Sequence, residues 1–200
     1  MFDEHVNMDA HVKSICRSAH FHLRNISKIR SFLTESATVQ LVHSLVTSRV
    51  DYCNSLLYGL PNSKIQKLQR IMNVACRIVC RIPKFVDVTP QLKELHWLPA
   101  EARILFKVLL ITFKAIHHKA PEYIQDLVIP YVPGRDGLRS ESLMHIDMGA
   151  RTNTKTYGDR SFQAAAAKEW NRLPLKLKEC QTVDSFKINL KTFLFEKFYN

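Results

Sequence analysis

Apolar residues recur at intervals of three and four along residues 63–81, and this period is that of one face of an α-helix. The predicted apolar face consists of Ile65, Leu68, Ile71, Met72, Ala75, Ile78 and Val79. A basic stripe lies opposite and consists of Lys67, Arg70, Arg77, Arg81 and Lys84, together with Val74. An earlier apolar helix ends before Pro61, so we predict a helical hairpin. Ser63 and Gln66 have the spacing of a capping box at the start of its second helix.

The helical period continues through most of the chain and predicts a mainly α fold. Only five glycines occur among 200 residues, and runs of alternating Val, Ile and Thr are few, which argues against a mainly β fold. The most apolar helix is expected at about residues 100–116 and should lie at the centre of the second half. Proline and glycine interrupt a polar segment at about residues 130–158. We expect a loop there, with one short strand near 143–148 that pairs with residues around Lys155.

The charge of the chain favours a partner that is rich in phosphate. Lys and Arg outnumber Asp and Glu by 29 to 18, which gives a formal net charge of +11. This excess points chiefly to nucleic acid and next to an anionic membrane surface. A second basic stripe precedes the first one and consists of Lys13, Arg17, His20, Arg24 and Lys28. No acidic residue occurs between Ala10 and Thr34 or between Asp51 and Asp87. The alternative is that both stripes only keep helices solvated.

The sequence contains no pattern of catalytic or metal-binding residues that we can identify. Paired carboxylates, a nucleophile with a histidine base and a glycine-rich phosphate loop are all missing. Cys76 and Cys80 lie one helical turn apart, but without a nearby histidine we interpret them as small core residues. Five cysteines form no disulfide framework, and neither a signal peptide nor a membrane-spanning run is visible. We therefore expect no cofactor, no metal, no membrane and an intracellular location, in the nucleus or the cytoplasm.

Several short motifs follow one another in order along nearly the whole chain. They are Asp51-Tyr-Cys-Asn-Ser-Leu-Leu-Tyr-Gly-Leu-Pro61, Leu68-Gln-Arg70 with Asn73 and Ala75, Leu92-Lys-Glu-Leu-His-Trp-Leu-Pro99, Phe106-Lys107, Phe113-Lys-Ala115, Ala120-Pro121, Thr156-Tyr-Gly-Asp-Arg160, Trp170-Asn171 and Leu173-Pro174. This ordered set resembles the C-terminal end of a LINE-type, non-LTR retrotransposon polyprotein, most closely the jockey and chicken-repeat group. Two further motifs, His11-Val-Lys-Ser-Ile-Cys16 and Phe21-His-Leu-Arg24, resemble the part of that reverse transcriptase that leaves the palm.

The resemblance implies a division of the chain and the loss of its catalytic parts. It implies a truncated palm exit at residues 1–8, a thumb-like helical domain at 9–88 and a C-terminal helical domain at 89–200. The palm of the family carries a metal-binding aspartate and a Tyr-x-Asp-Asp motif, and its endonuclease carries further acids. This chain contains neither, and Asp51-Tyr52 lacks the second aspartate of the motif. We therefore expect no enzyme activity from this chain alone.

Our first hypothesis is a noncatalytic remnant of an RNA-directed DNA polymerase of a mobile element. It would bind RNA or a template–primer duplex by the phosphate backbone. The predicted contact residues are Lys13, Arg17, Arg24, Lys28, Lys67, Arg70, Arg77 and Arg81. One alternative is a structural or protein-interaction remnant whose basic faces dock on the missing palm domain. Another is a decayed open reading frame without a selected role.

Overall fold

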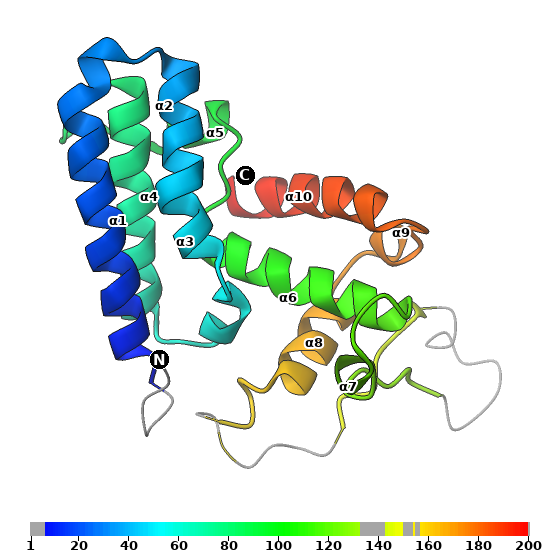
Figure 1. Ribbon diagram of the computed structural model, residues 1–200. Coiled ribbons are helices and arrows are strands. Elements are labelled where there is room, and N and C mark those ends of the chain that lie inside the picture. The colour runs from blue at the N-terminus through cyan, green and yellow to red at the C-terminus, as the bar shows by residue number, and fades with distance from the viewer. Residues whose placement is uncertain (1–6, 133–142, 150–153, 155–156, 200) are drawn as a thin grey trace. The chain divides into compact units, whose positions relative to one another are not determined.

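The computed structural model describes residues 7–132, 143–149, 154 and 157–199, and these residues form a mainly α-helical fold, as predicted (Figure 1). The chain divides into two compact units, Met1–Ile104 with Phe198–Asn200, and Leu105–Lys197. The first unit continues past residue 88 because Leu92, Trp97 and Ile104 pack into its core. The thumb-like identity of residues 9–88 stays a prediction.

The first unit is a bundle in which α1, α2 and α4 lie side by side (Figure 1). Its helices are α1 (Asp9–Ile29), η1 (Arg30–Phe32), α2 (Glu35–Val42), α3 (Ser48–Asp51), η3 (Asn54–Leu57), α4 (Asn62–Cys80) and α5 (Thr89–Glu94). A π-helical turn, η2 (His43–Thr47), joins α2 to α3. The start of α6 (Ala100–Ile116) and the end of α10 (Val183–Tyr199) also belong to this unit.

Helices α1 and α4 run in the same direction and form the longest contact in the bundle. At their first turns, Lys64 Nζ lies 3.1 Å from Asp9 Oδ2. Each helix buries the apolar stripe that its sequence pattern predicts. On α1 the buried residues are Val12, Ile15, Ala19, Leu23 and Ile26. On α4 they are Ile65, Leu68, Ile71, Met72, Ala75, Cys76 and Val79.

Arg30 connects the far ends of the same two helices. The last carbonyls of an α-helix have no partner within the helix, so a buried helix end needs an external donor. Arg30 Nε donates to Ile78 O at 2.9 Å, and Arg30 Nη2 donates to Val79 O at 2.8 Å. Its third nitrogen, Nη1, donates to Leu33 O at 2.7 Å. A buried arginine just after α1 therefore caps the C-terminal end of α4.

The predicted hairpin forms, but its capping box does not. Helix α4 begins at Asn62 after Pro61, and its N-cap makes no side-chain hydrogen bond. Ser63 consequently lies inside the first turn, where it cannot take the extended backbone conformation of a capping residue. Gln66 Nε2 instead donates to Asn62 Oδ1 at 3.3 Å. The hairpin is closed by η3, whose residues Asn54 and Leu57 are buried.

The second unit packs its helices around three aromatic rings. The helices are the remainder of α6, α7 (Glu122–Gln125), α8 (Phe162–Asn171), α9 (Leu175–Lys178) and most of α10. Phe113 and Phe186 stack with their centroids 4.2 Å apart and an interplanar angle of 13°. Trp170 lies 6.0 Å from Phe186, and all three rings are fully buried. Phe113 of α6 thus lies in the core of this unit.

The segment 143–149 pairs with the segment that follows α7. Ile146 forms an isolated antiparallel bridge with Pro130, and the flanking bonds are Tyr131 N to His145 O at 3.0 Å and Asp147 N to Ile129 O at 2.8 Å. The predicted pairing with residues around Lys155 stays a prediction, because Lys155 lies outside the described residues.

Candidate nucleic-acid interface

The structure places all eight predicted contact residues on the parallel pair α1 and α4. Arg81 is the residue that ends α4, and the other seven lie within the two helices. All of them are exposed except Arg77, which is half-buried. Two basic stripes from distant parts of the sequence therefore belong to one pair of neighbouring helices.

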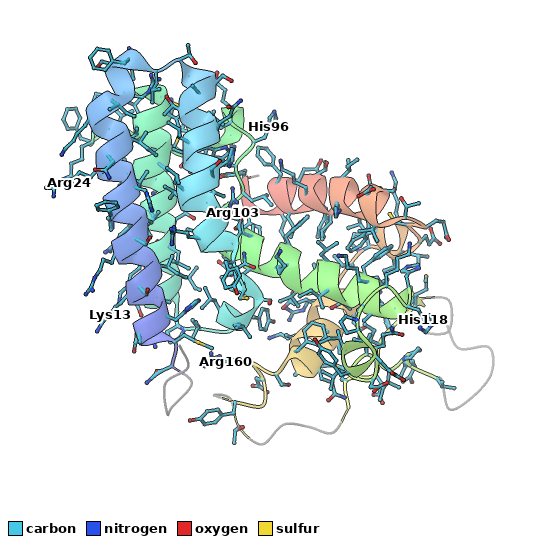
Figure 2. The ribbon with its side chains drawn as sticks, in the orientation of Figure 1. Lys13, Arg24, His96, Arg103, His118 and Arg160 are labelled. Atoms are coloured by element: carbon cyan, nitrogen blue, oxygen red, sulfur yellow. The ribbon has the colours of Figure 1, made fainter. Side chains whose placement is uncertain are left out.

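Four of these residues form the basic side of α1, which we define as Lys13, Arg17, Arg24 and Lys28. Because residues in an α-helix advance by about 100°, spacings of four, seven and four keep all four within about 60° of one another. Figure 2 shows Lys13 and Arg24 extending from the same side of α1, away from α2. The apolar face of α1 is buried, so its basic side meets solvent.

A groove of about 600 Å³ runs between α1 and α4 on this basic side. We call it the α1–α4 groove, and its lining consists of Arg17, His20, Phe21, Leu23, Arg24, Ser27, Val74 and Ile78. Helix α1 supplies all the polar residues of this lining, and α4 supplies Val74 and Ile78, which are half-buried. The groove therefore combines cationic side chains with an apolar floor.

Lys67 lies on the side of α4 that faces α1. Burial raises the pKa of the Cys16 thiol above its ordinary value, and the positive charge of Lys67 opposes that rise. Such an effect requires the ammonium group to lie close to Cys16 on α1. Lys67 is exposed, so α4 adds one positive charge beside α1. Arg70 is also exposed on α4.

Arg77 and Arg81 differ from the other six because each binds a backbone carbonyl. Arg77 Nη2 donates to Val86 O at 3.0 Å, and Arg81 Nη2 donates to Arg30 O at 3.1 Å. The pKa of Asp87 is lowered, chiefly by hydrogen bonds from Thr89 and slightly by Arg77. Arg77 therefore lies near Asp87, which is the first acidic residue after Asp51. These two arginines therefore form hydrogen bonds that connect the C-terminal end of α4 to neighbouring segments, and they also carry positive charge.

The eight predicted contact residues form no ion pair with a carboxylate within the described part of the chain. Ion pairs in that part include Lys64 with Asp9, Arg103 with Asp51, Arg172 with Glu169 and Lys187 with Asp184. None of the eight predicted contact residues takes part in them. Charge on the α1–α4 pair is consequently available for an external anion.

Among the described residues, no group of three His, Cys, Asp or Glu side chains could hold a metal ion. Cys76 is fully buried, and burial together with the neighbouring Cys80 raises the pKa of its thiol to about 12. It therefore stays protonated at neutral pH and is no nucleophile. None of the described helices combines the length and the apolar character that crossing a bilayer requires.

Phe21 lines this groove, and the sequence pattern did not single it out as a site residue. It lies on α1 four residues after Arg17 and three before Arg24, and 61% of its surface is exposed. A signal was present, because an aromatic residue on the basic side of an amphipathic helix interrupts the expected pattern. His20, which was part of the predicted stripe, also lines the groove.

Comparisons of the chain with protein-family models, with curated proteins and with solved structures gave no match.

Proposed function

We propose that this chain binds nucleic acid through the phosphate backbone, at the basic side of α1 and the adjoining side of α4. The observation that carries this proposal is the parallel packing of α1 and α4, with exposed cations of α1 lining the groove between the two helices. Within the described residues these cations have no carboxylate partner. The ordered motifs support an origin in the thumb and downstream region of a LINE-type reverse transcriptase, where such a surface would hold a template–primer.

The dimensions of the surface suit a polyanion. Lys13 and Lys28 are fifteen residues apart, which corresponds to about 22 Å along the helix axis. A strand of a duplex advances about 3.4 Å per phosphate, so the basic side of α1 spans roughly six nucleotides. Binding of this kind releases condensed counterions and therefore falls steeply as the salt concentration rises. It also discriminates little between sequences, because phosphates are the same at every position.

In this proposal the chain performs no chemistry of its own. Asp51, the aspartate of the first motif, accepts a hydrogen bond from Arg103 Nη1 at 2.8 Å. Its other oxygen accepts a long bond from Asn54 Nδ2 at 3.4 Å. The Asp51 carboxylate therefore makes structural hydrogen bonds with Arg103 and Asn54. A primer-extension assay with the purified chain should show no incorporation of nucleotides, and any incorporation would contradict this part of the proposal.

Fluorescence anisotropy with a labelled oligonucleotide tests the proposal directly. The triple variant R17A, R24A and R70A should weaken binding at least tenfold at 50 mM salt and flatten its salt dependence. The matched control removes three exposed lysines from the second unit, Lys168, Lys176 and Lys191, and so changes the net charge equally. This control should bind nearly as the original chain does. Equal losses in both variants, or no binding by the original chain, would refute the proposal.

A second candidate function is docking to a protein such as the palm of the parent polymerase. The observation in its favour is that Phe32 is 88% exposed and Phe85 is 91% exposed, and that each follows the C-terminal end of α1 or α4. Exposed aromatic residues of this kind often mark contact surfaces. The double variant F32S and F85S should reduce self-association in size-exclusion chromatography while leaving oligonucleotide binding intact. If the variant loses oligonucleotide binding instead, the two functions are not separate.

A further inference from the structure

Phe21 is exposed in the α1–α4 groove, and the binding of phosphates alone would not require an aromatic ring there. The residue is 61% exposed and lines the α1–α4 groove together with Arg17 and Arg24. A single exposed phenylalanine is common on protein surfaces. This one lies between two cations on the same helical side, whose Cα positions are seven residues or about 10 Å apart along the axis. The aromatic residue therefore lies, along the helix, between two guanidinium groups that can bind phosphates.

The groove itself is partly apolar, which matters for the kind of nucleic acid it fits. Val74 and Ile78 of α4 form its half-buried apolar part. A duplex presents phosphates and groove edges, while the faces of its bases are stacked inside and unavailable. A single strand can turn an unpaired base outward, and a base face stacks on an aromatic ring or packs against aliphatic side chains.

We propose that the α1–α4 groove binds single-stranded nucleic acid, with an unstacked base against the ring of Phe21 and the flanking phosphates on Arg17 and Arg24. This inference rests on the proposed function and narrows its ligand from any polyanion to an unpaired strand. Stacking on an aromatic side chain contributes enough per base that its loss should weaken binding roughly 5- to 100-fold. Duplex binding uses only the cations and should depend little on Phe21.

A tryptophan at position 21 gives a direct readout of stacking. The two tryptophans of the chain, Trp97 and Trp170, are 3% and 1% exposed, so the indole of F21W would be the exposed fluorophore. A single-stranded twelve-nucleotide DNA should quench its fluorescence because a base stacks on the indole. A twelve-unit abasic strand has the same phosphates without bases and should bind without comparable quenching. The matched control F32W places a tryptophan at a site that is 88% exposed and outside the groove lining, where no quenching is expected.

Affinity measurements with a second pair of variants complete the test. F21L keeps an apolar side chain but removes the ring, and F21A removes both. Both should lose roughly 5- to 100-fold in affinity for the single strand and less than twofold for a duplex of equal length. If the original chain binds but F21W is not quenched and F21L binds normally, this inference fails while the proposed function stands. If the chain binds none of the strands at low salt, the proposed function fails and this inference fails with it.

Discussion

Arg103 Nη1 lies 2.8 Å from Asp51 Oδ2, and this ion pair joins the first turn of α6 to the end of α3. The side chains are 14% and 35% exposed, so the pair is partly shielded from water. Arg103 Nε also donates to Leu98 O at 2.9 Å. The aspartate of the most distinctive motif therefore has a structural partner 52 residues away in sequence.

Removal of either partner should destabilise the first unit. D51A leaves a guanidinium partly buried without its carboxylate, and we expect a loss of about 1–3 kcal/mol in the free energy of unfolding. R103A should cost a similar amount. In a double-mutant cycle measured by urea unfolding, the two changes together should cost less than their sum. Strict additivity would show that the pair contributes nothing.

Arg30 should be difficult to replace because its planar fork reaches carbonyls on two segments. R30A would leave the carbonyls of Ile78 and Val79 without their donors and should cost about 2–4 kcal/mol of unfolding free energy. R30K offers one compact ammonium group and should recover only part of this loss. The measurement is chemical denaturation of the three proteins side by side. Full recovery by lysine would mean that charge alone matters at this position.

The stability of the first unit should fall at alkaline pH. Burial raises the pKa of Cys76 from about 9 to about 12 and that of Tyr199 from about 10 to about 12. Between about pH 9 and 12 the folded state therefore keeps the protons of Cys76 and Tyr199, whereas the unfolded state releases them. Stabilisation is full below about pH 9 and is lost as the pH rises toward 12, by up to about 1.4 kcal/mol per pH unit for each proton.

The variants C76A and Y199F remove one of these protons each, so both should show a shallower loss of unfolding free energy between pH 9 and 11. Y199F should also lose about 1 kcal/mol at neutral pH, because Tyr199 Oη donates to Trp97 O at 2.6 Å. A thiol reagent at pH 8 provides an internal check. The exposed Cys53 should react in the native protein, whereas the buried Cys76 should not. Unchanged slopes in both variants would contradict the assignment.

The basic residues should divide into two groups when stability and affinity are measured together. R17A and R24A should change the unfolding free energy by less than about 0.5 kcal/mol and lower the slope of log affinity against log salt by about 0.7 each on a single strand. R77A should weaken binding and also cost about 1–2 kcal/mol, because Arg77 donates to Val86 O. If only R77A weakened binding, the binding surface would lie on α4 and not on α1.

Asn171 should control the order of the segment 143–149. Its Oδ1 accepts from Ile146 N at 2.8 Å and its Nδ2 donates to Ile146 O at 2.9 Å, so the side chain takes the place of a neighbouring strand. N171A should speed hydrogen exchange of the Ile146 amide at least tenfold, since this proton loses its acceptor. The Asp147 amide, which donates to Ile129 O, should be affected less. Equal acceleration of both amides would indicate general unfolding of the segment.

Local patterns predicted the helices well and their ends less well. The intervals between Lys13, Arg17, Arg24 and Lys28 predicted a shared side of α1, because spacing on a helix depends only on the helix itself. The first and last residues of each helix were harder to predict, because several neighbouring polar residues could each act as the capping residue. Ser36 and Asp159 have the chemistry of capping residues, yet Thr34 and Ser161 accept the capping bonds from Ala37 N and Ala164 N. Differences of one or two residues in the start of a helix decide which side chain faces the free amides.

The amino-acid sequence alone determined the mainly helical class, the two basic stripes and the absence of a recognisable catalytic pattern, because these depend on residue type and on spacing within one element. Only the tertiary structure decided that α1 and α4 are parallel neighbours, that Phe21 lines a groove between two arginines, and that Arg30 binds carbonyls 48 and 49 residues away. Such contacts join residues far apart along the chain, and they arise from burial of two apolar faces against each other. No local period specifies which faces will meet.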